Sequence, residues 1–322
     1  MPIPAQLQAG LKLPVIAAPM FLVSGPELVI ACCQQGIIGT FPALNQRSTQ
    51  GFAEWLQIIR EALDQTKVKK PPAAYGVNLI VHKSNPRLAA DLDVCIEQRV
   101  PLIITSLGLV DSLIDRVHAS GGLVFHDVTT VRHAEKAAAA GVDGLILVCA
   151  GAGGHAGLIN PFAFTAAVRR FFKGTVILAG CLNNGHEVAA ARMLGADFAY
   201  MGTRFIATQE SRASDEYKQM ILRANTGDIT YTSAVSGVPG NFLAESLQLT
   251  GVDINKPGST ANIGAELAGH ADDHHGSKAW RDVWSAGQGV GGIEDVPKVA
   301  ELVSRLQIEF DLSTSRLANQ AD

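Results

Sequence analysis

The sequence predicts an α/β fold, a (β/α)8 barrel of the TIM type with a cap segment inserted after the eighth strand. Eight short apolar runs recur along the chain, and segments with apolar spacings near three and four residues separate them. Such alternation is typical of parallel α/β folds, among which a doubly wound sheet is the alternative. The chain of 322 residues, 47% of them hydrophobic, is long enough to bury the core of such a barrel.

The candidate strands are apolar on both faces, and most of them end in glycine, asparagine, threonine or proline. Strands of a parallel sheet have this continuous apolar character because both faces of the sheet are covered by other elements. The eight candidates are residues 15–20, 36–41, 73–81, 101–108, 122–128, 144–151, 175–180 and 197–203.

The candidate helices lie between these runs, and several of them end in glycine, which is a common helix stop. Thr129 or Thr130 can cap the fifth helix, since a threonine hydroxyl accepts a hydrogen bond from the first turn. The candidates are residues 26–36, 49–65, 85–99, 109–121, 130–141, 162–174 and 185–196.

The rhythm of strand and helix breaks after Phe205. We interpret residues 206–280 as an inserted cap, with a helical piece at 214–225 and a loop-rich stretch at 226–242. A last helix is expected from near Ile293 to about Phe310, followed by a frayed tail. The predicted barrel domain is therefore residues 1–205 plus 281–322.

Charge and cysteine content exclude several classes of partner. The formal net charge of −4 gives no reason to expect binding to nucleic acid or to an anionic membrane surface. The five cysteines are an odd number without zinc-site spacing, as in a cytoplasmic protein with reduced thiols. The amino-terminal segment lacks the apolar stretch of a signal peptide, and no apolar run approaches the ~20 residues that span a bilayer. A homodimer is left open.

Small residues gather at the carboxyl ends of the predicted strands, where barrel enzymes have their active sites. Backbone without bulky side chains can approach a flat ligand closely, so the small residues at these strand ends predict a bulky, planar ligand. Gly180 and the Gly202-Thr203 pair follow strands seven and eight, where barrels often bind phosphate through backbone N–H groups.

One histidine, His155, stands inside the glycine-rich stretch VCAGAGGHAG that follows strand six. An imidazole titrates near neutral pH and can exchange a proton with a ligand at the mouth, although a polar turn residue is the simpler interpretation. His126 is either a core residue with satisfied hydrogen bonds or a cofactor contact. The histidines and aspartates of residues 270–275 resemble metal ligands in type, but we interpret them as a surface loop and expect no metal site.

Seven segments together resemble the nitronate monooxygenase family, formerly called 2-nitropropane dioxygenase. They are LPVIAAPM, GVN, HDVTTVRHAEKA, AGAGGHAG, LAGC, MGTRFIATQES and WSAGQGVG, and the resemblance runs from about residue 11 to 310. It implies a TIM barrel that holds FMN noncovalently and oxidises alkyl nitronates with O2 to carbonyl compounds and nitrite. The family also includes an NADH:quinone reductase branch and flavin-dependent enoyl reductases.

The resemblance also implies roles for individual residues. His155 matches the active-site histidine of the family. The expected cofactor contacts are Ala18, Pro19, Met20, Asn78, Asp127, Gly153, Ala179, Gly180, Cys181, Met201, Gly202, Thr203 and Gln288. Two residues depart from the pattern: Cys181 stands where the family usually has a second glycine, and Asp127 stands where the quinone reductase branch has a basic residue.

Three functions follow as alternatives. The preferred one is an FMN-dependent nitronate monooxygenase whose small-molecule partners are a nitronate and O2. The second is an NAD(P)H-dependent FMN reductase that acts on quinones or enoyl thioesters. The third is a barrel that binds a flavin or another phosphorylated ligand without redox turnover.

Overall fold

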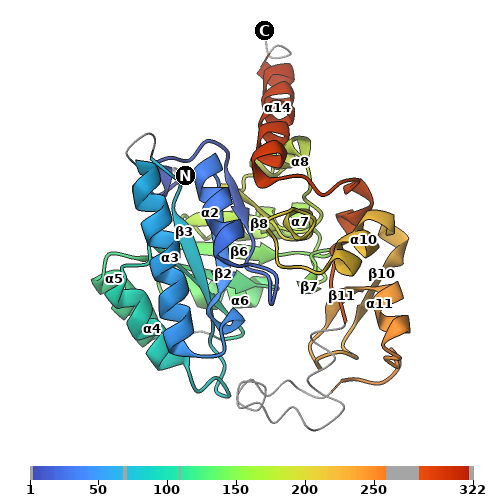
Figure 1. Cartoon of the computed structure of the whole chain (residues 1–322), viewed down its shortest axis with the longest axis horizontal. Coiled ribbons are helices and arrows are strands. Elements are labelled where there is room, and N and C mark those ends of the chain that lie inside the picture. Colours follow the sequence, from blue (N-terminus) through green and yellow to red (C-terminus); the bar gives the residue numbers. More distant parts are fainter. Residues whose placement is uncertain (1–2, 68–70, 109, 259–282, 319–322) are drawn as a thin grey trace.

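The chain folds into a closed barrel of eight parallel strands, as the sequence predicts (Figure 1). The computed structural model describes residues 3–67, 71–108, 110–258 and 283–318. The barrel strands, in their order around the barrel, are β1 (Val15–Ala17), β2 (Ile38–Pro42), β3 (Tyr75–Ile80), β4 (Leu102–Ser106), β5 (Leu123–Val128), β6 (Gly144–Val148), β8 (Thr175–Ala179) and β9 (Phe198–Met201).

Helices connect successive strands and cover the outside of the barrel (Figure 1). Local sequence signals start several of them: Thr130 Oγ1 accepts from the backbone N–H of His133, which selects Thr130 over Thr129 as the cap. Asn184 and Glu187 form a capping box at the start of the helix that follows residues 175–179. The connecting helices are α2 (Pro26–Gln35), α3 (Thr49–Lys67), α4 (Leu88–Glu97), α5 (Asp111–Ala119), α6 (Val131–Ala139), α7 (Pro161–Arg169) and α8 (Gly185–Met193).

The barrel has an inner and an outer apolar core, because side chains alternate between the two faces of each strand. On β5, for example, Leu123 and Phe125 belong to the inner core, whereas Val124 and Val128 belong to the outer core under the helices. Leu7 of the short helix α1 (Ala5–Gln8) also belongs to the inner core. The opposite end of the interior, at the carboxyl ends of the strands, is the barrel mouth.

The inserted segment contains more regular structure than the sequence predicts. Residues 226–242 were expected to be loop-rich, but they hold the 3-10 turn η2 (Thr226–Asp228) and the strand β10 (Ile229–Thr232), and β11 (Gly240–Leu243) begins there. The helices α10 (Asp215–Arg223) and α11 (Ala244–Leu249) flank them (Figure 1). These strands are short, and their three-stranded sheet is completed by a distant segment: β10 pairs with β11, and β11 pairs with β7 (Gly154–His155). Local sequence does not show that contact, so the strands were missed.

The last helix, α14 (Val299–Ala318), differs from the prediction at both ends. It begins six residues after Ile293, since residues 288–292 form the 3-10 turn η3 (Gln288–Gly292) and Pro297 lies just before the helix. It continues beyond Phe310 through residues that were expected to fray, and it lies beside α8 and projects from the body of the molecule (Figure 1). None of the helices in the described residues is both long and apolar enough to cross a membrane.

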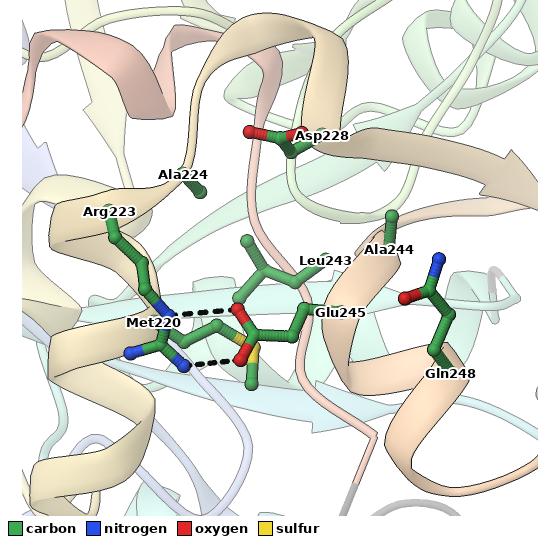
Figure 2. A pocket seen from close by; sticks show the side chains of 8 residues that line it. All are labelled: Met220, Arg223, Ala224, Asp228, Leu243, Ala244, Glu245 and Gln248. Atoms are coloured by element: carbon green, nitrogen blue, oxygen red, sulfur yellow. Dashed lines mark hydrogen bonds and ion pairs between the residues drawn. The ribbon is translucent and has the colours of Figure 1, made fainter.

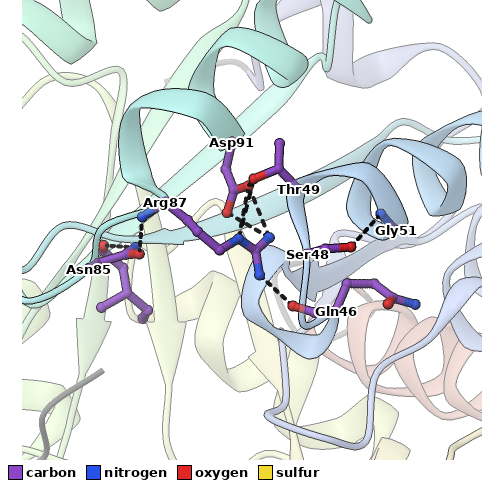
Figure 3. A network of polar contacts seen from close by, with 8 residues as sticks. Gln46, Ser48, Thr49, Gly51, Asn85, Arg87 and Asp91 are labelled. Atoms are coloured by element: carbon purple, nitrogen blue, oxygen red, sulfur yellow. Dashed lines mark hydrogen bonds and ion pairs between the residues drawn. The ribbon is translucent and has the colours of Figure 1, made fainter. Parts of the chain in front are cut away.

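A polar network fixes the loops that leave β2 and β3 at the mouth (Figure 3). The guanidinium of Arg87 forms an ion pair with Asp91 at 2.9 Å, and its Nη1 donates to the carbonyl of Gln46 at 2.5 Å. Thr49 Oγ1 donates to Asp91 at 2.7 Å. Because the Asp91 side chain is only 1% exposed, these contacts compensate the cost of burying its charge.

Candidate active site

Predicted cofactor contacts from the first and last barrel strands meet at the mouth. A Cβ placed on Gly202 would touch only Ala18 Cβ at 3.8 Å and Met20 Sδ at 3.9 Å, so this position is open. Thr203, the first residue of the short helix α9 (Thr203–Ile206), accepts a hydrogen bond at Oγ1 from the backbone N–H of Gly287 at 2.9 Å. The hydroxyl of Thr203 therefore holds the 286–288 segment against the end of β9.

A second cluster of predicted residues lies where the segments after β6 and β8 meet the same 286–288 segment. The backbone N–H of Gln288 donates to the carbonyl of Gly151 at 2.9 Å, and Cys181 Sγ lies 3.6 Å from that carbonyl. A Cβ on Gly153 would lie 2.8 Å from the nitrogen of Gly287. Gly153, Cys181 and Gln288 are exposed, so this cluster presents backbone and small side chains to the mouth.

The turn after β8 needs left-handed backbone. Gly180 has φ = 130° and Cys181 has φ = 56°, a region that side chains with a Cβ occupy at a cost of about 1–2 kcal/mol. A glycine is therefore the unstrained choice at position 181, which gives a physical reason for the glycine that the family usually has there. Cys181 is exposed, whereas the other four cysteines are buried.

Three further predicted contact residues expose little of their side chains at the mouth. The Met201 side chain is buried in the outer core, and its carbonyl accepts from the backbone N–H of Ala18 at 3.0 Å. Ala179 belongs to the inner core, and its carbonyl accepts from the N–H of Cys149 at 3.0 Å. Pro19 is half-buried beside Ala18.

Polar side chains replace apolar ones in the uppermost layer of the barrel interior. Asn78 Nδ2 donates to Ser106 Oγ at 2.7 Å, and Ser106 Oγ donates to Asp127 Oδ2 at 2.5 Å. Burial raises the pKa of Asp127 to about 6, although the hydrogen bond from Ser106 opposes that shift. Tyr200 of β9 packs against the inner core, and its buried hydroxyl has no hydrogen-bond partner in the described residues.

His155 lies on β7, which pairs with β11 of the inserted segment through Gly240. Its ring is half-buried, and its Nε2 lies 3.1 Å from Ser236 Oγ. Burial lowers the pKa of His155, so the neutral ring is favoured at pH 7. Asn241 Nδ2 donates to the carbonyl of Ala152 at 2.7 Å and anchors the strand pair beside the glycine run.

His126 does not reach the mouth. It alternates with Asp127 on β5 and points into the outer core, where it is 7% exposed and its Nδ1 lies 2.8 Å from Thr105 Oγ1. Burial lowers the pKa of His126 to about 4, so the ring is neutral. The structure therefore supports the core interpretation of His126 rather than the cofactor contact.

A separate pocket lies within the inserted segment, between α10 and α11 (Figure 2). Arg223 and Glu245 form a bidentate ion pair across it at 2.5–2.9 Å, with Met220, Leu243 and Gln248 around them. None of the predicted site residues lines this pocket. No metal-ligand group of three or more occurs among the described residues, and the histidine and aspartate cluster at 270–275 lies outside them.

Two residues of this site were missed as functional candidates from the sequence: Tyr200 and Ser236. Strand alternation places Tyr200 on the same face as the inner-core residue Phe198, so its position carried a usable signal. Ser236 carried none, because its contact with His155 joins positions 81 residues apart.

The sequence profile of the nitronate monooxygenase family matches residues 6–309. The chain belongs to this family. It is therefore an oxidoreductase of a flavin-dependent family.

Two curated relatives illustrate the range of the family. A nitronate monooxygenase of Paraburkholderia phytofirmans is 26% identical, over 97% of this chain and 96% of its own length. A relative from Rhodococcus jostii, named (3aS,4S,5R,7aS)-5-hydroxy-7a-methyl-1-oxo-octahydro-1H-indene-4-carboxyl-CoA dehydrogenase, is 30% identical over 74% of this chain and 64% of its own. The two names share oxidoreduction but not a substrate.

Two solved structures share the complete fold. FabK from Thermotoga maritima superposes with a TM-score of 0.80 at 25% identity, over 98% of this chain and 97% of its own. Nitroalkane oxidase from Streptomyces ansochromogenes superposes with a TM-score of 0.80 at 24% identity, over 97% of this chain and all of its own. The second likeness supports the fold alone.

Proposed function

We propose that the protein is an FMN-dependent nitronate monooxygenase that oxidises alkyl nitronates with O2 to carbonyl compounds and nitrite. Family membership and the nitronate monooxygenase of Paraburkholderia phytofirmans support this reaction. The observation that carries the proposal is the neutral His155 on β7, beside a glycine-rich mouth whose interior presents buried oxygens that have no hydrogen-bond partner among the described residues.

The residues at the mouth fit a flavin. A planar ring system needs an open rim of small residues and polar groups at its edge; Cys181 and Gly202 provide the open rim, and Gly153 presents exposed backbone beside them. Asp127 Oδ1 and the Tyr200 hydroxyl are buried without a hydrogen-bond partner in the described residues, which a ligand with a polar edge would correct. When bound, FMN would accept electrons from the substrate and pass them to O2.

The phosphate of FMN would lie at the turns after β8 and β9, formed by Gly180-Cys181 and Gly202-Thr203. Gly180 and Cys181 both have positive φ, a conformation found in turns whose backbone N–H groups bind anions, and the Gly202 position is open. Ala18, Met20 and Gln288 would border the ring, while Asn78 would contribute through the Ser106 chain.

His155 is positioned to handle a proton of the substrate. Ser236 Oγ donates to the carbonyl of Val238 at 3.2 Å, and a carbonyl oxygen can only accept. The Ser236 hydroxyl can therefore accept from His155 Nε2–H and orient the ring. Burial favours the neutral form of His155, and a neutral imidazole can take a proton from a nitroalkane.

A second candidate function is oxidoreduction of an acyl-CoA thioester with NAD(P)H as the electron donor. It is favoured by the Rhodococcus jostii relative, whose name contains a CoA thioester. The same barrel mouth would then receive the thioester, and the pyridine nucleotide would reduce the flavin.

Anaerobic mixing of the purified protein with alkyl nitronate, and separately with NADH, distinguishes these functions. We expect nitronate to bleach the flavin absorbance and NADH to leave it unchanged. Bleaching by NADH alone would support the second candidate, and a yellow protein inert to both would support ligand binding without turnover. A colourless protein that binds no FMN would refute the flavin site itself.

The variant His155→Asn tests the assigned base. It should retain FMN and lose at least about 100-fold in kcat with nitroalkane, as expected when a general base is removed. His133→Asn, an exposed histidine on α6, is the matched control. Unchanged turnover in His155→Asn would refute the assignment.

A further inference from the structure

Asp127 and Tyr200 form an incomplete polar site inside the barrel mouth. Asp127 Oδ1 and the Tyr200 hydroxyl are both buried without a hydrogen-bond partner in the part of the chain that the structure describes. The two side chains interact electrostatically, since the Asp127 charge raises the pKa of Tyr200 further after burial has raised it. They come from β5 and β9, so this interaction crosses the barrel interior rather than following neighbouring strands.

The hydrogen bonds around Asp127 determine which oxygen can carry a proton. Asn78 Nδ2 lies 3.3 Å from the carbonyl of Ile104, which can only accept, so the amide orientation of Asn78 is defined. Asn78 therefore donates to Ser106 Oγ, and the hydroxyl of Ser106 donates its single hydrogen to Asp127 Oδ2. Oδ2 is an acceptor, and a proton on Asp127 would lie on the unpartnered Oδ1.

Among the described residues, burial and the hydrogen bond from Ser106 act on the pKa of Asp127, and no cation does. The inward positions at the ends of the adjoining strands β4 and β6 are Ser106 and Val148, and those of β2 and β8 are Thr40 and Ala179. His126 on the same strand points into the outer core, and Tyr200 is the titratable side chain across the interior. An unpaired buried carboxylate is costly, so covering the mouth further favours its neutral form.

We propose that Asp127 takes up a proton from solvent when a planar ligand covers the mouth, and then donates a hydrogen bond from Oδ1 to an acceptor on the polar edge of that ligand, beside the Tyr200 hydroxyl. The ligand is identified as a flavin only through the function proposed above. No covalent bond of the ligand is broken. The ligand-bound site is thus electrically neutral at Asp127, which removes the repulsion that a carboxylate would exert on an anionic substrate.

If FMN binding is coupled to protonation of Asp127, the affinity for FMN must depend on pH, and this dependence can be measured. Asp127 with a pKa of about 6 is protonated in about one molecule in ten at pH 7, so full protonation would take up close to one proton. Each rise of one pH unit above 7 should then weaken FMN binding about tenfold. The phosphate of FMN is almost fully ionised in that range and contributes little.

The experiment titrates FMN into the full chain freed of bound flavin, between pH 7 and 8, in two buffers of different ionisation enthalpy. The wild type and the control Asp93→Asn, an exposed partner of Arg116, should take up close to one proton per FMN and show the tenfold weakening. Asp127→Asn should bind FMN with neither effect. Tyr200→Phe should keep the proton uptake but bind FMN more weakly.

The outcomes separate this inference from the proposed function. FMN binding with the same proton uptake in wild type and Asp127→Asn overturns the inference and leaves the flavin site intact. A wild-type affinity that does not change from pH 7 to 8 overturns it without any variant, so a misfolded Asp127→Asn would not protect it. Failure of the wild type to bind FMN refutes the proposed function, and the inference with it.

Discussion

Two adjacent residues on β5, His126 and Asp127, should make opposite contributions to stability as pH falls. Burial lowers the pKa of His126 from 6.5 to about 4, and burial raises the pKa of Asp127 from 3.8 to about 6. The unfolded chain binds protons more readily at the histidine, while the folded chain binds them more readily at the aspartate. Acidification through pH 6 therefore weakens the fold through His126 and strengthens it through Asp127.

The magnitudes follow from linkage over pH 7 to 5. Protonation of His126 in the unfolded chain lowers the free energy of unfolding by about 2 kcal/mol, because the folded ring stays neutral until pH approaches 4. Protonation of folded Asp127 raises that free energy by about 1 kcal/mol over the same interval. The two effects partly cancel, so these residues together change the wild-type stability by less than about 1 kcal/mol.

Single substitutions remove the cancellation. Urea unfolding at pH 5, 6 and 7 should show that Asp127→Asn loses about 1 kcal/mol more than the wild type on acidification, while His126→Asn loses about 2 kcal/mol less. His186→Asn, on the exposed surface of α8, is the control and should follow the wild type. If the stability of all four proteins changed with pH in the same way, the opposite pKa shifts of His126 and Asp127 would be refuted.

Three further substitutions test local features of the site. Ser236→Ala removes the acceptor that orients His155 and should lower kcat about fivefold while FMN affinity stays unchanged; an equal loss of FMN affinity would contradict this. Cys181→Gly relieves left-handed backbone at φ = 56° and should raise the free energy of unfolding by up to about 1 kcal/mol in urea titration. Asp91→Ala leaves the guanidinium of Arg87 without its ion-pair partner and should destabilise the chain by about 3 kcal/mol, which a lowered thermal midpoint would reveal.

Much of the barrel was predictable because its signals are local. Apolar runs, most of them ending in glycine, asparagine, threonine or proline, marked all eight barrel strands, and Thr129 or Thr130 marked the start of α6. The small residues Gly151, Gly180 and Gly202 likewise marked the mouth: a Cβ on Gly151 would lie 2.5 Å from Cys181 Sγ, whereas the Gly202 position is open. The boundaries of α14 were misjudged because a helix end depends on what its last turns contact, and α14 is supported by α8.

The sequence by itself determined the order of strands and helices, the family, and the presence of a histidine among glycines at the sixth strand. Only the tertiary structure decided that His155 belongs to a sheet with the inserted segment and contacts Ser236, and that Asp127 faces Tyr200 across the interior. The physical reason is range: apolar periodicity and turn residues act between near neighbours in the chain. Hydrogen bonds and burial depend on which distant segments meet once the barrel has closed.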